Sequence, residues 1–147
     1  MNPQWDNASA REVPIAALIP HSGAMCLLDR VIDWTDTTAR CTARSHRDAL
    51  NPLRHAGRLP AATIIEYAAQ AMAVHGGLVA AGRSPRAGML ASARNVELGV
   101  DRLDELADDL LIEVRMLTQE RNALLYVFEA HAGGQRIATG RIVVALQ

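Results

Sequence analysis

The sequence lacks several features that point to common classes of function. Lysine is absent, and fifteen basic residues face sixteen acidic ones, giving a net charge of −1. A nucleic-acid-binding surface is usually strongly basic, so none is expected. The two cysteines, Cys26 and Cys41, lack the CxxC spacing of zinc sites, and neither another metal-ligand spacing nor a phosphate-binding glycine loop occurs. We therefore expect small buried thiols, no metal and no bound cofactor.

The sequence also shows no targeting segment and no membrane-spanning segment. No basic stretch followed by an apolar run stands at the N-terminus, so no signal peptide is expected. The longest weakly charged stretch, residues 59–82, contains Glu, Gln and His and suits a protein core better than a bilayer. The 147 residues predict a single domain, 1–147, with residues 1–12 loosely attached, in a cytoplasmic protein without membrane contact.

Residues 59–82 carry the most informative periodicity. Pro60 stands where a helix would begin, and Gly82 and Pro85 predict its end. Apolar residues recur at helical spacing on nearly every side of this helix: Ile64, Ile65, Tyr67, Ala68, Ala71, Met72, Leu78 and Val79. His75 falls on the same stripe and is expected to be a core histidine with its hydrogen bonds satisfied. The helix must therefore be surrounded by protein.

Two strands are predicted before this helix and about four after it. Alternating or continuous apolar runs separated by turn residues indicate strands over 24–34, 38–46, 88–99, 110–118, 123–132 and 136–147. Residues 13–21 predict a short helical turn and residues 47–60 a loop. An α+β fold with an antiparallel sheet around a central helix satisfies this order. Because a sheet covers only one side of a helix, a second subunit is the expected cover for the other side.

Glu66 is the main candidate for chemistry. It is the only Asp, Glu, Lys or Arg between Leu59 and Gly82, and no cation lies one helical turn away. Burial without a partner raises the pKa of a carboxyl group, which suits it to proton transfer near neutral pH. The alternative is that an arginine from a loop or from a partner chain pairs with it.

Three further polar residues are candidates for the same site. Gln70 lies one turn after Glu66 and either flanks a cavity or bonds backbone carbonyls. His21 and His55 are the candidate proton-transfer partners of Glu66, although a loop histidine such as His55 is often only solvated. The N–H groups at the start of the helix lack intrahelical acceptors and suit a carbonyl oxygen that gains negative charge. The two other histidines are expected to be solvated: His46 and His131.

Two stretches resemble the hot-dog-fold 3-hydroxyacyl-acyl-carrier-protein dehydratases. Residues 19–31, "IPHSGAMCLLDRV", are similar to the entry into their first strand. Residues 59–73, "LPAATIIEYAAQAMA", resemble their central helix, with the same spacing from Ala61 to Glu66. The helix is most similar to that of dehydratase-like proteins of aryl-polyene or xanthomonadin-type pigment synthesis. The resemblance implies a hot-dog fold, in which an antiparallel sheet wraps around one long central helix.

The resemblance also implies roles for individual residues. Glu66 and a histidine would remove water from a 3-hydroxyacyl thioester in fatty-acid or polyene-type synthesis. The N–H group of Ala61 would support the thioester oxygen, and Gln70 would hold the carboxylate. The substrate would be carried on the phosphopantetheine of an acyl carrier protein or of CoA, and would enter a tunnel at the interface of a homodimer or heterodimer.

The chain departs from these dehydratases where their active histidine stands. The position 14 residues before the helix acid is Pro52, and the nearest histidine is His55, 11 residues before Glu66. Arg58 matches the missing histidine best by local context and is a candidate substrate contact. Three functions stay open: a dehydratase, a non-catalytic subunit that stabilises a catalytic hot-dog partner, and an acyl thioesterase on the same fold.

Overall fold

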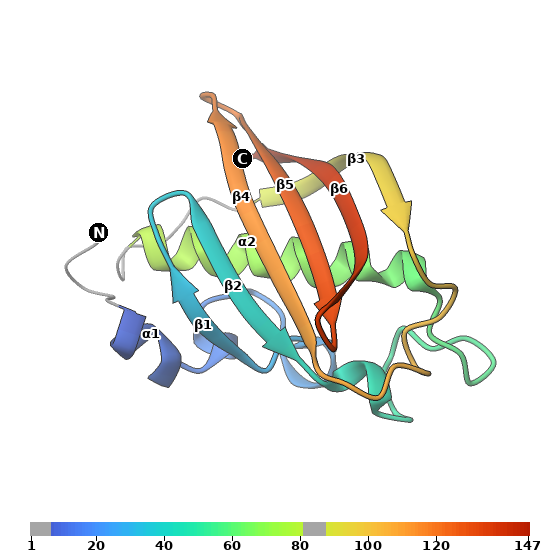
Figure 1. Ribbon diagram of the computed structural model, residues 1–147. Coiled ribbons are helices and arrows are strands. Elements are labelled where there is room, and N and C mark those ends of the chain that lie inside the picture. The colour runs from blue at the N-terminus through green and yellow to red at the C-terminus, as the bar shows by residue number, and fades with distance from the viewer. Residues whose placement is uncertain (1–6, 81–87) are drawn as a thin grey trace.

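The computed structural model describes residues 7–80 and 88–147, in which a six-stranded antiparallel sheet wraps around one long helix (Figure 1). The helices are α1 (Asn7–Glu12) and α2 (Ile64–Ala80). The strands are β1 (Arg30–Trp34), β2 (Thr38–Ala43), β3 (Gly88–Leu98), β4 (Leu110–Gln119), β5 (Ala123–Ala132) and β6 (Gln135–Leu146). They lie in the order β1-β2-β4-β5-β6-β3. The predicted antiparallel sheet around a central helix is confirmed.

The strand predictions are accurate after α2 and less so before it. The four strands that follow the helix begin and end within one residue of their predicted bounds. The strand predicted over 24–34 is shorter, because Gly23–Met25 forms a 3₁₀ turn and β1 begins only at Arg30. The carbonyl of Met25 and the N–H of Leu27 bond to the side chain of Gln70, and the first backbone bond to β2 is made by the N–H of Asp29, to Thr42 O.

The N-terminal segment is more ordered than predicted. Residues 7–12 form α1, and residues 1–6 lie outside the described part of the chain. Ala10 is fully buried, and Nε of Arg11 donates a hydrogen bond of 2.6 Å to the carbonyl oxygen of Ile32 in β1. The prediction that residues 1–12 are loose is therefore wrong for residues 7–12. The short helical turn predicted next is present as Ile15–Ala17.

The side of α2 that faces the sheet is the centre of the core. Ile64, Tyr67, Ala68 and Ala71 are fully buried there. They belong to a core cluster that also contains large sheet residues: Trp34, Ile112, Tyr126 and Phe128. Each large apolar side chain removed from water contributes about 1.5–3 kcal/mol, so this face fixes the helix against the sheet. The predicted helix end near Gly82 lies outside the described residues.

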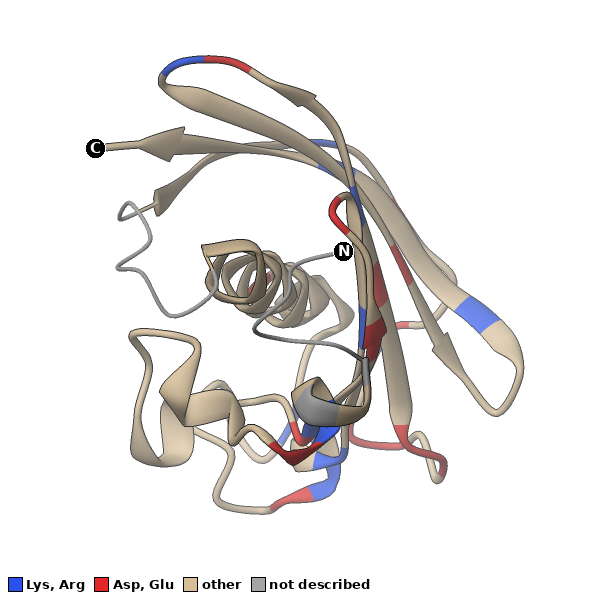
Figure 2. Cartoon of the chain, turned by 90° about the vertical axis from the view of Figure 1, so that its left-hand side faces the viewer, with Lys and Arg blue, Asp and Glu red and all other residues tan. Residues whose placement is uncertain are grey.

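No strand of the described residues covers the opposite side of α2 (Figure 2). Figure 2 looks nearly along the helix and shows the sheet curving around only part of it. Residues at helical spacing on the uncovered side are exposed or partly exposed: Ala62, Ile65, Glu66, Ala69, Ala73 and Gly76. A chain of this shape leaves a mainly apolar helix face available, as the prediction of a second subunit requires.

The two edge strands of the sheet differ in their cover. β1 packs against α1, whereas β3 pairs only with β6 among the described residues. β3 is exposed along most of its length, including Met89, Leu90 and Leu98. Its pairing with β6 shifts between Arg94 and Glu97, where Asn95 has a φ of 52°. The β3 edge is therefore open to another strand.

Two adjacent glycines in α2 differ in how closely other atoms pack against them. A methyl group on Gly77 would lie 2.8 Å from the carbonyl oxygen of Leu18, whereas one on Gly76 meets nothing within 4 Å. We expect Gly77→Ala to lower the free energy of unfolding by about 1–3 kcal/mol through overpacking. Gly76→Ala is expected to be neutral or to stabilise by up to about 1 kcal/mol through helix propensity. Urea denaturation measures both, and equal effects would contradict the packing described here.

Candidate active site

The start of α2 is fixed by an antiparallel pairing with a distant loop. Pro60 pairs with Arg102, the N–H of Leu103 donates to Leu59 O at 2.9 Å, and the N–H of Ala61 donates to Asp101 O at 3.0 Å. This pairing places the first turn of the helix without a side-chain cap. It also occupies the N–H of Ala61, the donor that the resemblance assigns to the thioester oxygen. The next donor, the N–H of Ala62, has no acceptor among the described residues.

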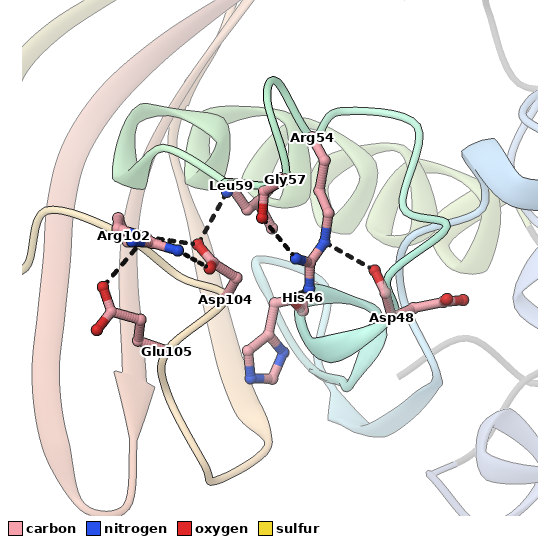
Figure 3. A network of polar contacts seen from close by, with 8 residues as sticks. All are labelled: His46, Asp48, Arg54, Gly57, Leu59, Arg102, Asp104 and Glu105. Atoms are coloured by element: carbon pink, nitrogen blue, oxygen red, sulfur yellow. Dashed lines mark hydrogen bonds and ion pairs between the residues drawn. The ribbon is translucent and has the colours of Figure 1, made fainter.

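Asp104 reinforces this pairing from the side (Figure 3). Its Oδ1 accepts a 2.8 Å hydrogen bond from the N–H of Leu59, and its Oδ2 lies 2.5 Å from Nη2 of Arg102. These two partners hold the pKa of the Asp104 carboxyl well below its usual range. The carboxylate therefore stays ionised and keeps the helix start in place until strongly acidic pH.

Glu66 lies in the first turn of α2, on the side away from the sheet. In this single chain its side chain is exposed, so the prediction that apolar neighbours enclose it is wrong for the chain alone. The cause is that the sheet covers only the opposite side. No ion pair or hydrogen bond holds Glu66 within the described residues. It also lines neither of two surface cavities, of about 570 and 510 Å³.

Gln70 is buried one turn further along α2 and is 2% exposed. Its Oε1 accepts a 2.9 Å hydrogen bond from the N–H of Leu27, and its Nε2 donates a 2.5 Å bond to Met25 O. Both ends of the amide are thus engaged by the segment that leads into β1. Gln70 thus bonds backbone, as one of its predicted roles requires, and no hydrogen bond joins it to Glu66 within the described chain.

His21 lies on this same N-terminal segment, four residues before Met25. The residue is partly exposed, but its Nδ1 is buried and has no hydrogen-bond partner within the described chain. The capacity of this nitrogen for one hydrogen bond is therefore unused within the described chain. His21 therefore keeps its place as a candidate, although it forms no bond with Glu66 in the single chain.

His55 and Arg58 lie on either side of a tight turn. Their backbones exchange two hydrogen bonds, of 2.8 and 3.0 Å, and the central residues Ala56 and Gly57 have φ values of 51° and 76°. Positive φ at both central positions is typical of a two-residue hairpin turn. Both His55 and Arg58 are exposed in this chain.

Arg54 holds this turn in place (Figure 3). Its Nε donates to Asp48 O at 2.9 Å, its Nη1 to Gly57 O at 2.9 Å, and its Nη2 to His46 O at 3.2 Å. One guanidinium thus gathers three carbonyls of a loop that has little regular structure. The sequence marked 47–60 as a loop but gave no signal for this arginine's role.

The two buried histidines are structural. His75 is confirmed as a satisfied core residue: its Nε2 donates to Thr35 O at 3.0 Å, so the neutral ring accepts from the Tyr126 hydroxyl at Nδ1, 2.8 Å away. His46 is fully buried, which corrects the prediction that it is solvated. Its Nε2 bonds the carbonyls of Leu106 and Asp108, and this tie between two loops has no periodic signature in the sequence.

A family of known proteins matches nearly the whole chain. The sequence model of the ApeP-like family, described as ApeP dehydratase, matches residues 13–147. The chain belongs to the ApeP-like dehydratase family. This ApeP-like protein is therefore a dehydratase-like hot-dog protein, and the resemblance seen in the sequence is confirmed. No curated protein sequence matches it.

Solved structures agree with this assignment. The ApeP-like chain is 28% identical to a chain of the dehydratase heterocomplex ApeI:P from Xenorhabdus doucetiae, with a TM-score of 0.82 over 92% of this chain and 91% of that one. Zebrafish thioesterase superfamily member 2 matches at 14% identity and a TM-score of 0.64, over 97% and 99% of the two chains. A hypothetical thioesterase with coenzyme A from Streptococcus pneumoniae TIGR4 matches at 11% and 0.59, over 90% of each. The last two show the fold alone.

Within residues 7–80 and 88–147, no helix is long and apolar enough to cross a bilayer.

The buried histidines predict how stability depends on pH. Burial lowers the pKa of His46 and of His75, so the folded chain binds fewer protons than the unfolded chain just below pH ~6.5. The free energy of unfolding should therefore fall as the pH drops from about 7 to about 5, by up to ~1.4 kcal/mol per pH unit for each histidine. Denaturation curves of His46→Gln should show a shallower fall, because one titrating group is gone. Identical pH profiles for the variant and the parent chain would contradict this.

Proposed function

We propose that this ApeP-like chain removes water from a 3-hydroxyacyl thioester, with Glu66 as one of two acid-base groups. The observation that carries the proposal is the position of Glu66. It is the only charged residue between Leu59 and Gly82, lies beside the start of α2 and has no partner within the described chain. Its carboxylate stands alone on an otherwise apolar helix face, where it is available to a substrate or a second subunit.

The same proposal includes a second hot-dog subunit over that helix face. α2 and the open edge of β3 supply an apolar surface and an unpaired strand edge, which together suit a partner of the same fold. The partner is a second copy or another hot-dog chain, as in the ApeI:P heterocomplex that this chain resembles. The cover would exclude water from the surroundings of Glu66.

The reaction needs one base and one acid. The base takes the proton from the carbon next to the thioester carbonyl. The electron pair of the broken C–H bond forms the new carbon–carbon double bond when the hydroxyl leaves. The acid protonates that hydroxyl, which departs as water. A backbone N–H at the start of α2 would stabilise the charge on the thioester oxygen. The Ala62 N–H suits this role better than that of Ala61, which donates to Asp101.

The second acid-base group is His21 or His55 in this proposal, and Arg58 is a substrate contact beside His55. His21 has a buried Nδ1 without a partner, and His55 stands on an ordered turn. The substrate would be held on the phosphopantetheine of an acyl carrier protein or of CoA, and no resident cofactor is needed for this chemistry.

A second candidate function is a non-catalytic subunit that stabilises an active hot-dog partner. Pro52 at the position of the usual catalytic histidine favours it, as does the similarity to one chain of a dehydratase heterocomplex. Co-expression with a catalytic homologue separates the two ideas. Turnover that survives Glu66→Gln in this chain within such a heterodimer would favour the structural role.

Glu66→Gln tests the main proposal directly. The amide keeps the size of the side chain but neither gives nor takes a proton, so dehydration should fall by about 10² or more. The assay follows enoyl thioester formed from a 3-hydroxyacyl thioester, with the chain alone or with its hot-dog partner. Undiminished turnover would exclude the role, and free acid as the main product would indicate a thioesterase instead.

Paired histidine variants assign the second group. His21→Gln and His55→Gln are compared under the same assay, and the variant of the true partner should lose about 10²-fold in kcat. It should also lose one limb of the pH–rate profile, because that limb reports the removed group. Losses below about threefold for both variants would remove both histidines from the mechanism.

A further inference from the structure

The loops that carry His21 and His55 are joined to α2 through one continuous, partly buried network. On the first loop, the N–H of Leu27 donates to Gln70 of the helix, and its carbonyl accepts a 2.7 Å bond from Oγ of Ser45. Both backbone groups of Leu27 are therefore fixed. This attaches the segment that contains His21 to two separate elements.

Tyr67 stands at the centre of the network. Its side chain is fully buried, and it directly follows Glu66 in the sequence. Its hydroxyl lies 2.7 Å from Oγ of Ser45 and 3.1 Å from Nδ2 of Asn51. Burial raises the pKa of the Tyr67 hydroxyl, so it remains protonated and able to donate.

The direction of every bond in this network follows from its two ends. A carbonyl only accepts, so the single hydroxyl proton of Ser45 goes to Leu27 O. The bond between Ser45 and Tyr67 must then be donated by Tyr67. Asn51 Nδ2 only donates, so the oxygen of Tyr67 accepts from it. The result is a one-way chain from Asn51 through Tyr67 and Ser45 to Leu27, in which each bond strengthens the next.

The other end of the network reaches the turn with His55. Oδ1 of Asn51 accepts from the N–H of Leu53 at 2.9 Å, and its Nδ2 also donates to Ser45 O at 2.9 Å. Arg54 then carries the connection to the carbonyl of Gly57 inside the turn. Both candidate histidines thus lie on segments connected to one hydroxyl that is adjacent in sequence to Glu66, and Gln70 and Arg54 add further bonds to the same segments.

We propose that Tyr67 is the positioning residue of the site, and that its hydroxyl holds both histidine-bearing loops in register with the turn of α2 that carries Glu66. Its effect on turnover rests on the proposed function, but its effect on the loops does not. A displacement of about 1 Å in an acid-base group can cost 10²-fold in rate, so loss of this anchor should lower kcat far more than it changes KM.

The chain supplies a matched control for the test. Tyr126 is the other tyrosine, is also buried, and also gives one hydroxyl bond to a buried side chain, Nδ1 of His75. That bond does not reach either histidine-bearing loop. Tyr67→Phe and Tyr126→Phe each remove a single buried hydroxyl, so the two variants should lose similar amounts of overall stability.

The experiment measures hydrogen exchange and turnover in both variants, with the hot-dog partner present if one is required. Tyr67→Phe should raise exchange in residues 21–29 and 45–58 by about tenfold or more, and Tyr126→Phe should not. It should also lower kcat by about tenfold or more while KM stays within about threefold. Unchanged exchange in Tyr67→Phe, or the same loss of kcat in both variants, would overturn the proposal.

A parent chain without turnover is a separate result. It would remove the proposed function, and the exchange measurement alone would then decide whether Tyr67 holds the loops.

Discussion

The structure depends on how α2 is covered. One side of this helix is buried by a sheet that curves around it, and the other side carries exposed or partly exposed small and apolar residues with Glu66 among them. The buried side stabilises the chain, and the uncovered side leaves the carboxylate outside the core. Stability and proposed chemistry are therefore assigned to opposite faces of one element. A change on the sheet side acts on folding, whereas a change on the open side acts on assembly and on the environment of Glu66.

Periodic features of the fold were readable from the sequence. Apolar runs between turn residues predicted β4 and β5, alternation over residues 38–46 predicted β2, and helical spacing after Pro60 predicted α2. These patterns arise because each element buries one face, which imposes a repeat on its apolar residues. Residues 24–34 misled the prediction because their apolar run satisfies backbone groups with a glutamine 45 residues away, from Met25 to Gln70. A run of apolar residues does not reveal which hydrogen-bond partners it will find.

The candidate site was predictable in its residue types but not in its contacts. An isolated carboxylate such as Glu66 stands out in an uncharged segment, His21 and His55 were candidate partners by residue type, and the resemblance to dehydratases added the reaction. The roles of Tyr67, Asn51 and Arg54 had no signal, because each depends on loops brought together only by the fold. The solvent exposure of Glu66 differs from the prediction for another reason. One chain does not contain the surface expected to cover it.

β3 shows what that missing surface means for a chain without a partner. Its outer edge pairs with no described residue and it exposes Met89, Leu90 and Leu98, whereas α1 packs against the opposite edge strand. Unpaired strand edges and exposed apolar side chains are the features through which proteins aggregate and through which chaperones and proteases remove them. If the proposed assembly forms, a subunit without its partner would be degraded. The abundance of this protein would then follow that of the chain it pairs with.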